Sequence, residues 1–150
     1  MAAKLGLAME PNSPAPLEDM WYYAVAGERL KPGRVLAKTL MGEPILLGRG
    51  KDGDVFALRD LCPHRGIPLS CGWFNGDEVT CRFHAWRFDR TGRCTAIPSL
   101  APDQEFDPQR IKVKTYPVRE VQGNVWIFFG KDWESAPEIP LVPEAGDSRP

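Results

Sequence analysis

The sequence predicts an all-β domain, built as an antiparallel sandwich or barrel. Short stretches of aromatic and β-branched residues recur at intervals of about ten residues, with glycine-containing turns between them. No stretch carries the 3.6-residue apolar repeat of a long amphipathic helix. We expect a flexible N-terminal tail over residues 1–18, a folded domain over 19–133, and a proline-rich linker or truncated end over 134–150.

The first half of the folded domain is expected to supply four strands. The aromatic and β-branched stretch 21–27 ends in glycine and is the first of them. The stretches 34–40 and 43–49 are separated by a Met-Gly pair, which suits a tight hairpin turn. A glycine-rich turn follows, and the stretch 54–60 is the next expected strand.

The second half adds a strand and two hairpins. The stretch 78–83 is expected to be extended, because it is rich in β-branched and aromatic residues. The stretch 87–97 is expected to fold back on itself about residues 90–92. The last stretch, 115–130, is expected to pair two strands about a turn at 122–124.

The charge and hydropathy of the chain argue against nucleic acid and membrane as partners. The formal net charge is −1, so no overall attraction to a polyanion is expected. The longest run of large apolar residues is 125–129, whereas a membrane-spanning helix needs about 20 residues. The N-terminal residues lack a secretory pattern, so we expect a cytoplasmic protein. In a reducing compartment, closely spaced cysteine and histidine are typical of metal sites rather than disulfides.

The candidate ligands form two short pairs, Cys62-x-His64 and Cys81-x-x-His84, separated by 16 residues. Each pair follows an expected strand, so two loops are expected to meet over a metal centre at the tip of a sheet. The single residue between Cys62 and His64 disfavours a zinc finger, in which two to four residues generally separate paired ligands. A structural zinc site remains an alternative.

The sequence around these pairs resembles the Rieske iron–sulfur motif, in which two histidines replace two cysteines on one of the two irons. The first loop reads CPHRG from residue 62 and continues with Pro68, Ser70 and Gly72. The second reads CRFHAWRF from residue 81. Over about residues 20–130 the chain is similar to the N-terminal Rieske domain of the oxygenase (alpha) subunit of Rieske non-haem iron oxygenases. The ring-hydroxylating and aromatic O-demethylase branches are the nearest.

The resemblance implies a Rieske 2Fe-2S cluster, with the two cysteines on one iron and the two histidines on the other. Its metal ligands would be Cys62, His64, Cys81 and His84. The residues expected around the cluster are Arg65, Gly66, Pro68, Gly72, Ala85 and Trp86. Glycine lets the backbone approach the cluster closely, or serves ordinary turns. Trp86 is expected to shield the cluster from water, or to be a plain core residue.

The resemblance also bears on the redox properties. Two histidines in place of two thiolates leave the oxidised centre neutral, which favours electron uptake compared with a four-cysteine cluster. Electron uptake is expected to couple to protonation of a ligand histidine. Ile67 and Phe83 stand where respiratory Rieske proteins carry disulfide cysteines. We therefore expect a potential toward the low end of the Rieske range, about −150 mV. Cys71 and Cys94 are expected to be free thiols, with a disulfide between them as the alternative.

Arginines dominate the charged residues around the two pairs. Residues 59–95 contain six arginines and four acidic residues, in a chain whose net charge is −1. This local excess favours docking of an acidic electron donor, such as a reductase or ferredoxin. Alternatively, the arginines only keep the loops soluble.

The family's oxygenases activate oxygen at a mononuclear Fe(II) held by two histidines and a carboxylate. This sequence has only two histidines, and both are assigned to the cluster. We therefore expect an electron-transfer part of an oxidoreductase that does not act on substrate by itself. The mononuclear iron would lie in a further catalytic domain. If the oxygenase is a trimer, the iron that receives the electron would belong to a neighbouring subunit. The alternative is a stand-alone Rieske ferredoxin-like carrier.

Overall fold

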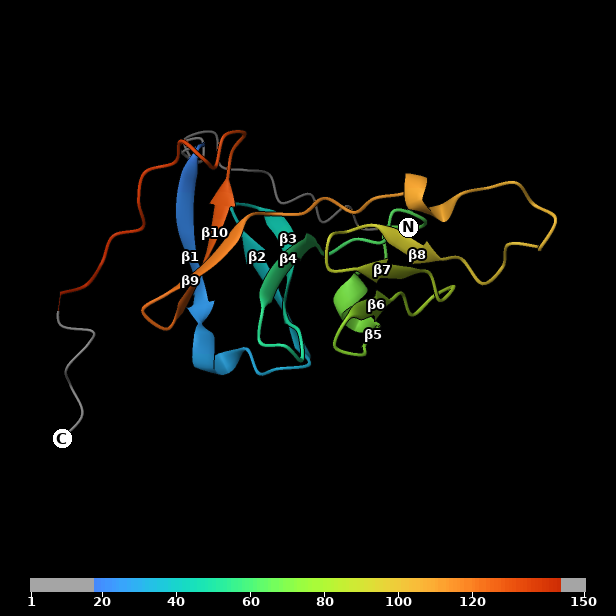
Figure 1. Cartoon of the computed structure of the whole chain (residues 1–150), viewed down its shortest axis with the longest axis horizontal. Helices are drawn as coiled ribbons and strands as arrows, with labels where there is room; N and C mark the ends of the chain where they lie inside the picture. The colour runs from blue at the N-terminus through green and yellow to red at the C-terminus, as the bar shows by residue number, and fades with distance from the viewer. Residues whose placement is uncertain (1–17, 144–150) are drawn as a thin grey trace, which may run out of the picture.

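The computed structural model describes residues 18–143, which form three antiparallel sheets arranged side by side (Figure 1). The predicted all-β fold is confirmed. Apart from residue 18, the expected N-terminal tail lies outside the described residues, as do residues 144–150 of the expected linker. No helix in the described part of the chain has the length and apolar character needed to cross a membrane.

The first sheet has the order β1-β10-β9, with β1 at Met20–Ala26, β10 at Asn124–Phe129 and β9 at Val118–Val121. Strands β9 and β10 form the predicted hairpin. Its turn is shorter than predicted, because Asn124 already pairs with Val121 as the first residue of β10. The two turn residues, Gln122 and Gly123, have φ of 49° and 73°, as a two-residue hairpin turn requires.

The second sheet has the order β2-β3-β4, with β2 at Arg34–Leu40, β3 at Glu43–Arg49 and β4 at Val55–Arg59. The predicted Met-Gly turn joins β2 to β3, and its residues also have positive φ, 51° and 73°. The turn was predicted correctly from Gly42, because glycine adopts positive φ without steric cost, whereas Met41 adopts it against the usual preference of a side chain.

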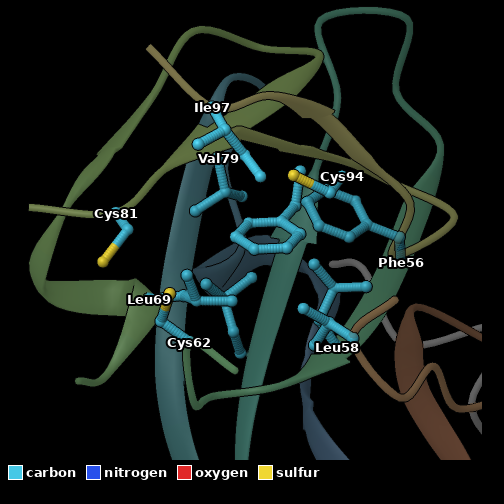
Figure 2. Packing of buried hydrophobic residues seen from close by; sticks show 11 residues of the cluster. Phe56, Leu58, Cys62, Leu69, Val79, Cys81, Cys94 and Ile97 are labelled. Carbon is cyan, nitrogen blue, oxygen red and sulfur yellow. The ribbon is translucent and has the colours of Figure 1, made fainter. Parts of the chain in front are cut away.

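The central strand of the second sheet, β3, has an apolar core on each face. Ile45 and Leu47 of β3 pack into an apolar core shared with the first sheet. Leu46, between them, packs into a second core. Val79 and Cys94 of the third sheet belong to this second core (Figure 2). Successive side chains of a strand point to opposite faces, so a central strand with a core on each side needs a continuous apolar run.

The third sheet contains the second pair of candidate ligands, between two of its strands, whereas the first pair lies between the second and third sheets along the chain. The order of the third sheet is β5-β6-β7-β8, from Trp73–Phe74, Glu78–Thr80, Arg87–Asp89 and Cys94–Ala96. Short 3-10 helices lie at Gly27–Arg29 (η1), Leu69–Cys71 (η2) and Pro108–Arg110 (η3). The predicted strand 78–83 ends at Thr80, because Cys81 already belongs to a closed loop. Strand β5 was not predicted, since two residues leave no recognisable pattern.

Residues beyond β10 contact the domain in the part that is described. The Gln122 side chain accepts a hydrogen bond from the Val142 N–H at 2.9 Å and donates one to its carbonyl at 3.0 Å. Ile139 is buried. This segment therefore lies against the folded body near the β9–β10 turn.

Candidate metal centre

The first ligand loop follows β4 and is closed by two backbone hydrogen bonds. The Gly66 N–H donates to the Cys62 carbonyl at 2.7 Å, and the Cys62 N–H donates to the Ile67 carbonyl at 2.8 Å. Gly66 has φ +70°, and a Cβ at this position would meet no atom within 4 Å. Glycine is favoured here by the backbone conformation and not by lack of space.

The second ligand loop follows β6 and repeats the same hydrogen bonds. The Ala85 N–H donates to the Cys81 carbonyl at 3.0 Å, and the Cys81 N–H donates to the Trp86 carbonyl at 2.8 Å. Ala85 occupies the place of Gly66 and has φ +58°, in the left-handed region that side chains disfavour. Thus the two loops share one backbone frame, although their histidines follow the cysteines at different spacings.

The two thiols lie together at the edge of the apolar core. Cys62 and Cys81 are both buried, and Figure 2 shows them on one side of the core, with Cys94 elsewhere. Burial raises the pKa of the Cys62 thiol to about 11, and the adjacent Cys81 thiol contributes to the rise. The backbone N–H groups of His64 and Arg65 bond to the Cys62 sulfur and oppose that rise. Two buried thiolates here would need the charge of a metal centre.

The two imidazoles lie on the outer side of the loops. Their ring centroids are 4.8 Å apart, and His84 is exposed whereas His64 is half-buried. Trp86 stacks flat on His64 with centroids 4.3 Å apart, and Phe83 meets His84 edge-on at 4.3 Å. Desolvation, and then the charges of His84 and Arg65, lower the pKa of His64. This favours the neutral imidazole, which is the form that binds metals.

Gly72 allows the segment after the first loop to pass against the strand that enters the second. A Cβ on Gly72 would lie 1.9 Å from the Thr80 carbonyl oxygen. Thr80 is the residue before Cys81, so this close approach brings the two loops together. Pro68 immediately precedes η2, on the path between the first loop and Gly72.

Asp60 was missed in the sequence, although it precedes Cys62 by two residues. It is the buried charged residue of the described part of the chain, at 4% exposure. Its carboxylate accepts hydrogen bonds from the Ser70 N–H at 2.7 Å and the Ser70 hydroxyl at 2.5 Å. Its position at a strand end resembled ordinary turn chemistry, and the partner ten residues later left no local pattern.

The surface around the loops is positive. Of the six arginines noted in the sequence, Arg90 forms ion pairs with Asp52 at 2.8 Å and Asp77 at 3.6 Å. The other five are exposed and form no ion pair with residues in the described range. They are Arg59, Arg65, Arg82, Arg87 and Arg93.

The remaining cysteines are free. Cys71 is exposed, and Cys94 is buried with its thiol 3.7 Å from the Ala96 carbonyl. The disulfide considered as an alternative is therefore not formed.

The donor set fits a two-iron cluster. Among the described residues, no three His, Cys, Asp or Glu side chains gather around one point as ligands of a single ion. Instead, thiol lies beside thiol and imidazole beside imidazole. In a Rieske cluster, two cysteines bind one iron and two histidines bind the other. The Trp86 indole N–H is also buried beside His64, without an acceptor in the described part of the chain.

Comparison with known proteins agrees with this fit. The chain matches the family described as the Rieske 2Fe-2S domain over residues 20–117. It is 36% identical over 131 residues to a 4beta-methylsterol monooxygenase of Methylococcus capsulatus, covering 87% of this chain and 36% of the relative. It is 32% identical over 127 residues to a 3-chlorobenzoate-3,4-dioxygenase oxygenase subunit of Comamonas testosteroni, covering 84% of this chain and 29% of the relative.

A solved structure has the same fold. It is the reduced complex between oxygenase and ferredoxin in carbazole 1,9a-dioxygenase, with a TM-score of 0.68 and 31% identity. The match covers 77% of this chain and 30% of that one. The chain thus spans about a third of the length of the relatives it matches.

Proposed function

The chain belongs to the Rieske 2Fe-2S domain family, and we propose that it transfers single electrons through a cluster held by Cys62, His64, Cys81 and His84. The observation that carries this proposal is the pairing of two buried thiols with two outward imidazoles on loops of one backbone frame. When bound, such a cluster supplies one-electron transfer at a potential set by its ligands and surroundings.

The proposed ligands divide into an inner and an outer pair. Cys62 and Cys81 hold their end of the centre within the apolar core, where water is excluded. His64 and His84 hold the other end at the surface, where a partner protein can approach. The surface histidines are therefore the proposed point of electron exchange. Trp86 covers one face of His64 and fixes the plane of its ring.

We propose that an acidic reductase or ferredoxin is the electron donor. The five exposed arginines that form no ion pair within residues 18–143 support this, because their field attracts a negatively charged partner. A ferredoxin complex of a similar oxygenase is also known.

The proposed electron acceptor is the mononuclear iron of an oxygenase catalytic domain, in the same or a neighbouring subunit. Relatives about three times as long, named as oxygenases, support this proposal. Their names include a methylsterol and a chlorobenzoate as substrates, so the acceptor is proposed without a substrate. Residues 19–133 are the proposed extent of the domain, and a cytoplasmic location stays a prediction.

The test uses the spectrum of the cluster and not oxygenase activity. The protein should contain about two irons and about two sulfides per chain, and give a Rieske EPR signal when reduced. His64→Ala and His84→Ala should each abolish the native signal. Cys71→Ser is the matched control, because this exposed cysteine is outside the proposed ligand set. A native signal retained in either histidine variant would contradict the assignment, and a colourless zinc protein would contradict the function.

A further inference from the structure

We propose that Asp60 is a positioning residue, whose bonds to Ser70 hold the two ligand loops at the separation that the cluster requires. This inference rests on the proposed function, because it assumes that Cys62 and Cys81 are ligands. We refer to Asp60 and Ser70 as the latch. The proposal concerns the geometry of the hydrogen bonds and not a change of protonation.

The latch fixes the start of the first loop. Asp60 lies between β4 and Cys62, and its backbone N–H donates to the Pro44 carbonyl at 2.9 Å. Its carboxylate is bound at both oxygens by one residue, through the Ser70 N–H and the Ser70 hydroxyl. Two bonds to one partner restrain orientation as well as distance. Helix η2, which contains Ser70, is therefore held against the root of the first loop.

The segment after the latch leads directly to the second loop. Within η2, the Gly72 N–H donates to the Leu69 carbonyl at 3.0 Å, so Gly72 follows the helix rigidly. Its Cα lies against the Thr80 carbonyl without room for a side chain. The next residue, Trp73, pairs with Thr80 in the β5–β6 ladder. A shift of η2 would therefore move β6, the strand that leads into Cys81.

The cost of burying the Asp60 carboxylate favours a specific positioning role over general packing. A buried carboxylate is costly to desolvate unless its oxygens are hydrogen-bonded. No ion pair among the described residues includes Asp60. The two hydrogen bonds to its carboxylate both come from Ser70. An apolar residue could fill the same space without that cost, so we infer that the directional bonds are what the site needs.

The chain offers a matched control. Asp89 likewise accepts hydrogen bonds from the N–H and the hydroxyl of one residue, Thr91, at 2.8 Å and 2.6 Å, in the β7–β8 turn. Both reach the same carboxylate oxygen, which also accepts from the Arg93 N–H at 3.2 Å. That turn does not connect the two ligand loops. Asp89→Ala therefore removes a comparable contact between a carboxylate and a hydroxyl-bearing residue, and we expect it to leave the separation of Cys62 and Cys81 unchanged.

The experiment compares Asp60→Ala, Asp60→Asn, Ser70→Ala and Asp89→Ala with wild type. Readouts are iron content, the rate of cluster loss to a chelator, the EPR spectrum and the reduction potential. Removing a group that supports metal ligands typically costs 10–100-fold, so Asp60→Ala should lose its cluster at least about 10-fold faster, with a shifted potential and broadened EPR lines. Asp60→Asn should stay near wild type, because its amide can accept from the Ser70 N–H and donate to the hydroxyl.

Ser70→Ala should lose its cluster at a rate between those of Asp60→Ala and Asp60→Asn, since it keeps the bond from the backbone N–H and loses the one from the hydroxyl. If Asp60→Ala behaves like Asp89→Ala, or if Asp60→Asn is as impaired as Asp60→Ala, the latch is refuted. Should Asp60→Ala fail to fold, the decision passes to Ser70→Ala, which must lose its cluster faster than Asp60→Asn. A wild-type protein without a Rieske signal would instead refute the proposed function itself, and the latch with it.

Discussion

Exchanging the left-handed residues of the two ligand loops should change stability in opposite directions. Gly66 and Ala85 occupy equivalent places, each donating its N–H to the carbonyl of the cysteine four residues earlier. Ala85 has φ +58° and Gly66 has φ +70°. We expect Ala85→Gly to stabilise the protein and Gly66→Ala to destabilise it.

The magnitude follows from two opposing contributions. An L-residue in the left-handed region costs about 1–2 kcal/mol, which Ala85→Gly would relieve. Glycine has more freedom in the unfolded chain, which costs about 0.4–1 kcal/mol. The net change should be about 0.5–1 kcal/mol of stabilisation. Gly66→Ala should cost a similar amount, because the new Cβ would meet nothing within 4 Å and only the backbone opposes it.

The assay is the free energy of unfolding from urea titration, with cluster absorption followed in the same samples. Gly123→Ala is the control: it has φ +73° and equal space around its Cβ, but lies in the β9–β10 turn. It should lose as much stability as Gly66→Ala while its cluster spectrum stays unchanged. Destabilisation by Ala85→Gly would refute the reasoning, since the strain at Ala85 would then be outweighed by contacts of its methyl group.

Three further changes test the site and its scaffold. Gly72→Ala should destabilise the protein by about 1–3 kcal/mol and lower iron content, because its Cβ would lie 1.9 Å from a backbone oxygen; normal iron loading would contradict this. Trp86→Leu should lower the free energy of unfolding by about 0.5–1.5 kcal/mol more than the loss of buried area explains, because it removes the ring stacked on His64. Trp86→Phe, which keeps a ring there, is the variant for comparison. Two hydrogen bonds from Arg49 lower the pKa of Glu120 from its ordinary 4.5, so this pair stabilises the fold above that pH and is lost as pH falls through the lowered value. Glu120→Gln should therefore lower the free energy of unfolding by about 0.5–1 kcal/mol at pH 7, and in urea titrations the difference from wild type should shrink as the pH falls below 4.5.

Local chemistry explains what could be predicted from the sequence. The hairpin turns at Met41–Gly42 and, one residue too long, at 122–124 were predicted from their glycines, because glycine adopts positive φ without steric cost. The family followed from the resemblance of two short local motifs, CPHRG from residue 62 and CRFHAWRF from residue 81, to the Rieske motif. Their roles as ligands stay a prediction.

Contacts between distant residues explain what could not be predicted. Strand β5 exists because Trp73 and Phe74 find partners in β6, and not because of their own pattern. The close approach of Gly72 to Thr80 and the bonds of Asp60 to Ser70 depend on how the chain folds back. The apolar run in β3 gave no sign that each of its faces meets a different core.

The same buried cysteines serve the apolar core and the proposed cofactor. Cys62 and Cys81 pack with Leu69, Val79 and Phe88, so the proposed cluster site is assembled in the folded state. Any ligand that binds only the folded state raises its population by mass action. A shortage of iron or sulfide in the cell would then act first on how much of this protein survives proteolysis, before it acts on how fast each molecule works. Abundance, measured after iron starvation, would report cofactor supply.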